Sequence, residues 1–216
     1  MQSDFCVTFA AMNKILQQQA QWSENVILAD ADYIDKVAFN LTVNFERMIG
    51  RRIPQADMAK WLECVALDGG LRPPDAPPSP NTQVILIYGC GKVKLENFTP
   101  SSYKTELHGK AFKGELGEFV ISAYECPDSR MGGEDFFIEA LALAANQQEV
   151  KRLMVIPNAD DPIIYNKVRE TLRQTNGQKT TTVFAMQPMV GGTFQQEILG
   201  YSLMAALGIR ADEIKP

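Results

Sequence analysis

A short apolar run near the start of the chain, Asn25-Val26-Ile27-Leu28-Ala29, is the feature that most constrains the fold. It ends in two carboxylates, Asp30 and Asp32, and a helical pattern follows at once. An apolar run without alternating polar residues is typical of a strand that is buried on both faces, as in parallel sheets covered by helices. Ligands of open α/β sheets bind at the carboxyl ends of the strands. Asp30 and Asp32 are therefore the first candidates for a functional site.

Strand and helix patterns alternate along the rest of the chain. Apolar runs predict further strands at 83–88, 118–124, 151–156 and 180–186. Apolar side chains at helical spacing predict helices after Asp32, after Pro54, at 100–112, after Gly132-Gly133, after Pro162 and after Gly191-Gly192. Gly50 is the expected stop of the first of these helices. We predict an α/β fold, a three-layer α/β/α sandwich with a mostly parallel central sheet of about five strands.

The domain organisation is predicted to be simple. Residues 23–216 are expected to form a single α/β domain, with a proline-rich surface loop at 71–82. Residues 1–22 are expected to form an amphipathic helix, because apolar side chains recur there at helical spacing. This helix either packs on its own domain or is exchanged with a second subunit, which would make the protein a homo-oligomer.

Composition excludes several classes of protein. The formal charge of −5 argues against broad electrostatic binding to nucleic acid or to an anionic membrane. The four cysteines are scattered and there is one histidine, so neither a zinc site nor a disulfide framework is expected. No apolar run has the roughly 20 residues of a membrane helix. Since the chain also lacks the pattern of a signal peptide, we predict a cytoplasmic protein without a membrane partner.

Acidic residues recur where predicted strands end or helices begin. After Asp30 and Asp32 they are Glu134, Asp135, Asp160 and Asp161. In a parallel sheet these positions can converge on one edge, and such a cluster of carboxylates takes up protons or binds a cation. Oxygen ligands without histidine or cysteine favour Mg²⁺ or Mn²⁺. The alternative is that these acids cap helix N-termini, where carboxylates accept free N–H groups.

The order of these elements resembles the NYN branch of the PIN-like nuclease superfamily over roughly residues 24–190. The similar segments are Val26–Asp30, Gln83–Tyr88, Tyr103–Tyr124, Gly132-Gly133-Glu134-Asp135 and Ile156-Pro157-Asn158-Ala159-Asp160-Asp161. The resemblance implies that Asp30, Asp135 and Asp160 hold a divalent metal that cleaves RNA phosphodiesters, assisted by Asp32 or Asp161. Asn158 stands where the family has its first aspartate after that strand. An asparagine offers a carbonyl oxygen to a metal but no charge.

Two other interpretations of the same residues stay open. Asp30-Ala31-Asp32 also resembles the DxD motif of haloacid-dehalogenase-like phosphatases, in which the first aspartate is a nucleophile and the second an acid/base. That family's later Gly-Asp-x-x-x-Asp motif is absent from this chain. A non-catalytic domain that keeps the fold and acts through protein contacts is the remaining possibility.

The basic residues support RNA binding less strongly than the acidic residues support a metal site. Arg47, Arg51 and Arg52 cluster soon after the acidic strand and could contact phosphates. A solvated helix end explains the same cluster without any ligand. Gly191-Gly192-Thr193 could bind an anion at a helix start, or it could simply cap that helix.

Overall fold

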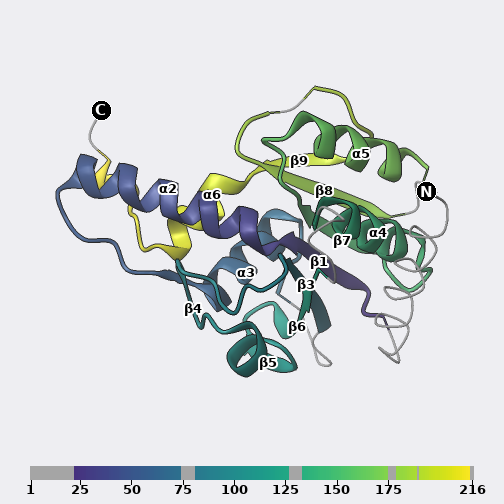
Figure 1. The fold of residues 1–216 in the computed structure, drawn as a ribbon, viewed down its shortest axis with the longest axis horizontal. Coiled ribbons are helices and arrows are strands. Elements are labelled where there is room, and N and C mark those ends of the chain that lie inside the picture. Colours follow the sequence, from purple (N-terminus) through teal and green to yellow (C-terminus); the bar gives the residue numbers. More distant parts are fainter. Residues whose placement is uncertain (1–21, 74–80, 127–132, 175–178, 189, 215–216) are drawn as a thin grey trace.

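The computed structural model describes residues 22–73, 81–126, 133–174, 179–188 and 190–214. They form an α/β fold around a seven-stranded, mostly parallel sheet (Figure 1). The strands of this sheet are β1 (Asn25–Asp30), β3 (Asn81–Tyr88), β5 (Lys110–Gly114), β6 (Gly117–Glu125), β7 (Arg152–Ile156), β8 (Thr180–Ala185) and β9 (Gln195–Ile198). The α-helices are α2 (Ala31–Ile49), α3 (Met58–Asp68), α4 (Gly133–Asn146), α5 (Pro162–Arg173) and α6 (Leu199–Ala206).

The strand order places the first strand in the middle of the sheet. Across the sheet the order is β5-β6-β3-β1-β7-β8-β9, and all neighbours are parallel except β5, which is antiparallel to β6. The chain moves outward from β1 through β3 to β6, and then returns to the other side of β1 with β7. This reversal creates a topological switch point between β1 and β7, the place where open α/β sheets bind ligands.

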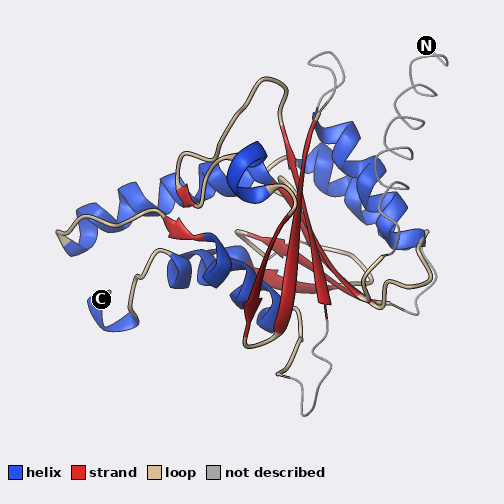
Figure 2. Ribbon diagram, turned by 90° about the horizontal axis from the view of Figure 1, so that it is seen from below, coloured by secondary structure: helices blue, strands red, loops and turns tan. Residues whose placement is uncertain are grey.

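Helices cover both faces of the sheet (Figure 2). Ile27 and Ala29 of β1 belong to a core cluster formed with α2, α3 and α6. Val26 and Leu28 of the same strand belong to a second cluster, formed with α4 and α5. All four side chains are fully buried, as expected for a strand whose alternate residues face two apolar layers.

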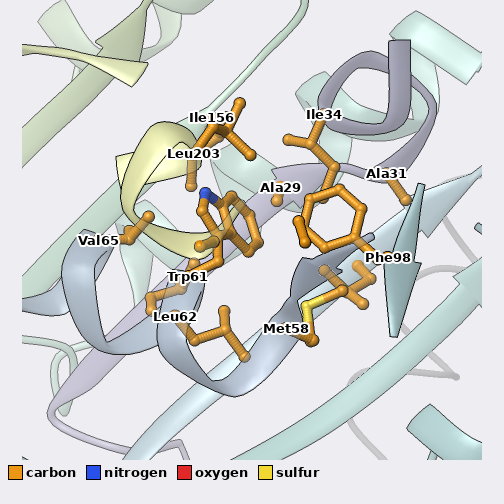
Figure 3. Close-up of a cluster of buried hydrophobic side chains, with 14 of the residues drawn as sticks. Ala29, Ala31, Ile34, Met58, Trp61, Leu62, Val65, Phe98, Ile156 and Leu203 are labelled. Carbon is orange, nitrogen blue, oxygen red and sulfur yellow. The ribbon is translucent and has the colours of Figure 1, made fainter. Parts of the chain in front are cut away.

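A small parallel pair of strands closes one end of the first core. β2 (Ala56–Asp57) pairs with β4 (Phe98–Thr99), and this brings the ring of Phe98 to 5.6 Å from that of Trp61 in an edge-to-face arrangement. Both rings are fully buried. Figure 3 shows Trp61 surrounded by side chains from α3, α6 and the central strands. Among the described residues, Trp61 is the largest fully buried side chain in this core.

The ends of α2 follow from its sequence. The Asp30 carboxylate accepts a hydrogen bond from the Tyr33 N–H at 3.0 Å and so caps the first turn. Gly50 ends the helix in the left-handed conformation, with a φ of 71°, and its N–H donates to the Glu46 carbonyl. The predicted stop at Gly50 is confirmed.

Replacing Gly50 with alanine should lower the stability by about 1 kcal/mol. An added Cβ would meet nothing within 4 Å, so the cost comes from the left-handed backbone alone. For a chain of this size the expected change is a fall of about 2–4 °C in the melting temperature, measured by circular dichroism. Gly200→Ala is the matched control, because Gly200 lies within α6 and its Cβ would make only ordinary contacts. The control should be neutral or stabilising, and a Gly50 variant as stable as the parent would contradict this account.

The predicted strands at 83–88, 118–124, 151–156 and 180–186 are confirmed to within two residues. The predicted number of strands is too low, because β5 and β9 were missed. β9 has the sequence Gln-Gln-Glu-Ile, and its residues are mostly exposed at the edge of the sheet. Such a polar segment carries no apolar signal, so its strand conformation comes from pairing with β8.

Three helix predictions are wrong at their boundaries or throughout. The segment 100–112 forms a single π-helical turn at Tyr103–Leu107 and then enters β5, since pairing with β6 overrides its weak helical pattern. Pro54 lies before α3, which begins at Met58 after Asp57 caps it. Gly191 and Gly192 do not start α6, because β9 lies between them and that helix.

Two predictions concern residues outside the described part of the chain. The N-terminal helix at 1–22 falls there except for Trp22, and so does most of the loop at 71–82. Within the described ranges, no helix is long and apolar enough to cross a membrane.

Candidate functional site

Asp30 lies at the carboxyl end of β1, beside the switch point. It is the last residue of a buried strand and also the N-cap of α2. The pKa of its carboxyl is raised from 3.8 to about 6. Burial is the main cause and the charge of the nearby Asp32 adds to it, while hydrogen bonds from the Tyr33 and Asp32 backbone N–H groups and the charge of Lys92 act in the opposite direction. Asp30 is therefore a carboxyl that changes its charge close to neutral pH.

Tyr33 connects Asp30 to the neighbouring strand. Its N–H donates to Asp30, and its hydroxyl donates to Oδ1 of Asp160 at 3.0 Å. Burial and the charge of Asp160 raise the pKa of this hydroxyl, so it stays protonated and remains a donor. Tyr33 thus contacts two of the predicted acids, Asp30 at the end of β1 through its backbone N–H and Asp160 in the turn after β7 through its hydroxyl.

Asn158 lies in the same turn as Asp160. Its side-chain Oδ1 is buried and has no hydrogen-bond partner among the described residues. A buried acceptor without a partner costs about 1–3 kcal/mol, so this oxygen is suited to bind a donor or a cation. An open depression of about 500 Å³ adjoins the turn, lined by Lys36, Asn158, Asp160, Asp161, Pro162 and Ile163. We call Asp30, Tyr33, Asn158 and Asp160 the switch-point site.

Asp32 is held on the β3 side of this site. Its carboxylate pairs with Lys92 Nζ at 2.9 Å and accepts a hydrogen bond from the Gly89 N–H at 3.1 Å. A Cβ on Gly89 would approach the Asp32 carboxylate to 2.8 Å, so the loop after β3 comes this close only with glycine. Asp32 thus fixes the loop after β3 against the start of α2.

The remaining predicted acids are used in other ways. Asp135, in the first turn of α4, pairs with Lys167 of α5 at 2.6 Å, and about half of its side chain is exposed. Glu134 is exposed next to it and contributes to the raised pKa of Lys167. Asp161 caps α5 by accepting a hydrogen bond from the Ile163 N–H at 2.7 Å. For Asp161 the capping interpretation is the one that the structure supports.

The three predicted phosphate-binding arginines lie at the other end of α2. Counted along the helix, Arg47 is about 24 Å from its start. Arg51 makes a two-pronged ion pair with Glu213, at 2.7 and 2.8 Å, and Arg52 pairs with Glu46. Arg51 therefore ties the end of α2 to the C-terminal segment, and none of the three reaches the switch-point site.

The four predicted metal ligands, Asp30, Asp32, Asp135 and Asp160, do not form one cluster. Among the described residues, no three carboxylate, histidine or cysteine side chains are grouped so that they could hold a metal ion. The oxygen donors that do face the switch point are two carboxylates and one amide. The sequence reasoning missed Tyr33, Lys36 and Lys92. Helical spacing could have shown the first two, because Tyr33 lies three residues after the capping Asp30 and Lys36 lies three residues after Tyr33.

Comparison with known proteins gives a family but no function. The model of a family described as a family of unknown function, DUF6621, matches residues 19–214. No protein with a curated description and no solved structure matches the chain. The assignment of a function therefore depends on the geometry of the switch-point site.

Proposed function

We propose that this chain, which belongs to the DUF6621 family, is a divalent-metal-dependent phosphodiesterase with a PIN/NYN-like α/β/α sandwich and a reduced acidic site. The observation that carries the proposal is that Tyr33 contacts both acids beside the switch point: its backbone N–H donates to Asp30, and its hydroxyl donates to Asp160. A partly buried carboxyl with a pKa raised to about 6, next to a second carboxylate contacted by the same tyrosine, is characteristic of sites that bind a cation or transfer a proton.

The donor set fits Mg²⁺ or Mn²⁺. Asp30 and Asp160 would supply two negative oxygens, and Asn158 Oδ1 would supply a neutral one that has no partner among the described residues. Hard divalent cations accept such oxygen ligands and keep water in the remaining positions. When bound, the ion would activate a water molecule and stabilise the charge that develops on a phosphoryl group.

The side chains around these oxygens have defined roles in the proposal. Tyr33 holds the Asp160 carboxylate in one orientation, because its hydroxyl donates to Oδ1. Lys36 lines the depression next to Asp160 and would attract the phosphate group of a substrate. RNA is the substrate class that the resemblance to NYN domains implies, and a cytoplasmic location would suit it. The depression is open to solvent, as a polymeric substrate requires.

Binding of Mn²⁺ to the protein tests the proposal. We expect Mn²⁺ to bind in calorimetry and to raise the melting temperature, since a ligand at 100 times its Kd stabilises the folded state by about 2.7 kcal/mol. Asp160→Asn should weaken this binding by about tenfold or more. The affinity should also rise with pH through about 6, because the metal competes with the proton on Asp30.

The matched control is Glu118→Gln, which also removes one negative charge but at the amino end of β6, whereas the switch-point site lies at the carboxyl ends of the strands. Glu118 is exposed and lies near the start of β6, away from the carboxyl edge of the sheet. Its Mn²⁺ affinity should equal that of the parent. Cleavage of a labelled single-stranded RNA in Mn²⁺ should fall in the Asp160 variant and not in the control. If Mn²⁺ neither binds nor stabilises the parent protein, the proposal is wrong.

A second candidate is a non-catalytic domain that keeps the fold and works through protein contacts. The observation that favours it is the dispersal of the predicted acids, above all the pairing of Asp135 with Lys167. The haloacid-dehalogenase-like interpretation gains less support, because Asp32, its expected acid/base, is paired with Lys92. Absence of both metal binding and RNA cleavage would favour the non-catalytic domain.

A further inference from the structure

A pocket on the outer side of α5 has no part in the switch-point site. It lies between α5 and the residues just before β9, of which Gly192 and Thr193 line it. The pocket has a volume of about 230 Å³ and is lined by Asn166, Arg169, Glu170, Arg173, Gly192 and Thr193. We call it the α5 arginine pocket.

The wall opposite α5 is anchored to that helix. The Tyr165 hydroxyl donates to the Gly191 carbonyl at 3.2 Å, and the ring of Phe194 packs edge-to-face against Tyr165. Gly191 has a φ of 81°, and a Cβ there would approach Arg169 Nη2 to 3.0 Å. The backbone can therefore lie directly against the guanidinium group, and the pocket is built by specific contacts.

The two arginines in the pocket have no acidic partner among the described residues. Arg169 and Arg173 are four residues apart on one face of α5, and neither forms an ion pair with a described residue. Arg169 donates from Nη1 to the Asn166 side chain at 3.3 Å, whereas its Nε is buried without a partner in the described part of the chain. With Glu170 on the rim, the lining keeps a net charge of +1, from two positive groups and one negative group.

Two like charges held together on one helix face repel each other, and an unpaired buried donor adds a further cost. A bound anion would remove both costs at once. We propose that Arg169 and Arg173, together with the Thr193 hydroxyl, bind the phosphate group of a ligand in the α5 arginine pocket.

The donors favour a phosphate over a carboxylate. A carboxylate has two oxygens and a single charge, which one guanidinium group satisfies. A phosphate monoester presents three oxygens and a charge of about −1.5 to −2, which matches two guanidinium groups and a hydroxyl. The volume of the pocket accommodates a phosphate with part of the group attached to it. This inference does not depend on the metal site.

Titration with inorganic phosphate in EDTA, at constant ionic strength, tests the proposal. Saturable binding should appear in calorimetry, together with a shift of the Arg169 Nε–H resonance in NMR spectra. Arg169→Gln and Arg173→Gln should each weaken phosphate binding by about tenfold or more, the usual loss for a charge-assisted hydrogen bond. The matched control is Lys113→Gln on β5, at the opposite edge of the sheet, which should bind phosphate as the parent does.

Further ligands distinguish the sources of the phosphate group. A nucleoside monophosphate that binds more tightly than inorganic phosphate would identify a small phosphorylated molecule. A single-stranded RNA oligonucleotide that competes with phosphate, and loses affinity in the Arg169 variant, would identify the nucleic-acid backbone. Acetate binding as tightly as phosphate would overturn the proposal, and so would equal phosphate affinity in the arginine variants and the control. Circular dichroism spectra and melting curves confirm that each variant is folded.

Discussion

Asp30→Asn should make the protein more stable at pH 7.5, by up to about 3 kcal/mol, while it removes the response to Mn²⁺. The pKa of the Asp30 carboxyl is about 6 in the folded protein, whereas its ordinary value is 3.8. The folded state therefore holds a proton that the unfolded state releases as the pH rises from about 4 to 6. Each pKa unit corresponds to 1.36 kcal/mol. The charged carboxylate thus destabilises the folded protein above pH 6, and asparagine removes that cost.

The capping hydrogen bond survives this substitution. Asparagine caps helices as well as aspartate does, so the acceptor for the Tyr33 N–H is retained. Urea unfolding of both proteins in EDTA, at pH 4 and at pH 7.5, measures the effect. The difference between the two proteins should be close to zero at pH 4 and should reach its full size at pH 7.5.

Asp57→Asn is the matched control for this measurement. Asp57 caps α3 with the same geometry, accepting a hydrogen bond from the Lys60 N–H at 3.0 Å, but it is exposed. Its replacement should change stability by less than about 0.5 kcal/mol at either pH. If the Asp30 variant is less stable than the parent at pH 7.5, Asp30 is a structural cap and not a destabilised functional carboxyl.

Trp61→Ala should cost about 3–5 kcal/mol, a large share of the 5–15 kcal/mol by which domains are usually stable. Trp61 is fully buried on α3 and packs against Phe98 in the core shown in Figure 3. Alanine would leave a large cavity between α3, α6 and the sheet. Chemical unfolding followed by circular dichroism should show an earlier midpoint at an unchanged slope.

Trp61→Phe separates loss of volume from loss of polarity. The indole Nε1 is buried without a hydrogen-bond partner among the described residues, so the tryptophan N–H lowers stability and does not add to it. Phenylalanine removes this group and leaves a smaller cavity. We expect a loss of less than about 1.5 kcal/mol. Equal losses for alanine and phenylalanine would show that the indole N–H has a partner and that this hydrogen bond contributes more to stability than packing does.

The buried parts of the fold could be predicted from sequence, whereas the edges could not. β1, β3 and β7 are continuous apolar runs, because both of their faces lie under helices. β9 is mostly polar and exposed, so it becomes a strand only through its hydrogen bonds to β8. A helix was wrongly predicted before β5 for a related reason. Tyr103 and Leu107 are buried at helical spacing, but the segment forms only one helical turn.

The location of the candidate site in the fold could be predicted from the sequence, but the side chains that form it could not. The sequence indicated that Asp30 lies at the carboxyl end of a buried strand, and the structure puts it beside the switch point. The partners of the other acids could not be predicted from the sequence, because side-chain direction depends on helix packing. Asp135 faces Lys167 since α4 and α5 pack against each other. Tyr33 reaches Asp160 because α2 begins directly after Asp30.

The central place of β1 in the sheet has a consequence for how the protein is made. Among the strands of the described residues, β1 leaves the ribosome first, and β3 can pair with one of its edges soon afterwards. Its other edge stays unpaired until β7 is made, which begins 64 residues after the end of β3, or about 3–13 s of translation at about 5–20 residues per second. During that interval an apolar strand has an open edge, the kind of surface on which chains aggregate. The same delay means that Asp30 and Asp160 meet only late in synthesis, so the switch-point site is assembled after most of the chain exists.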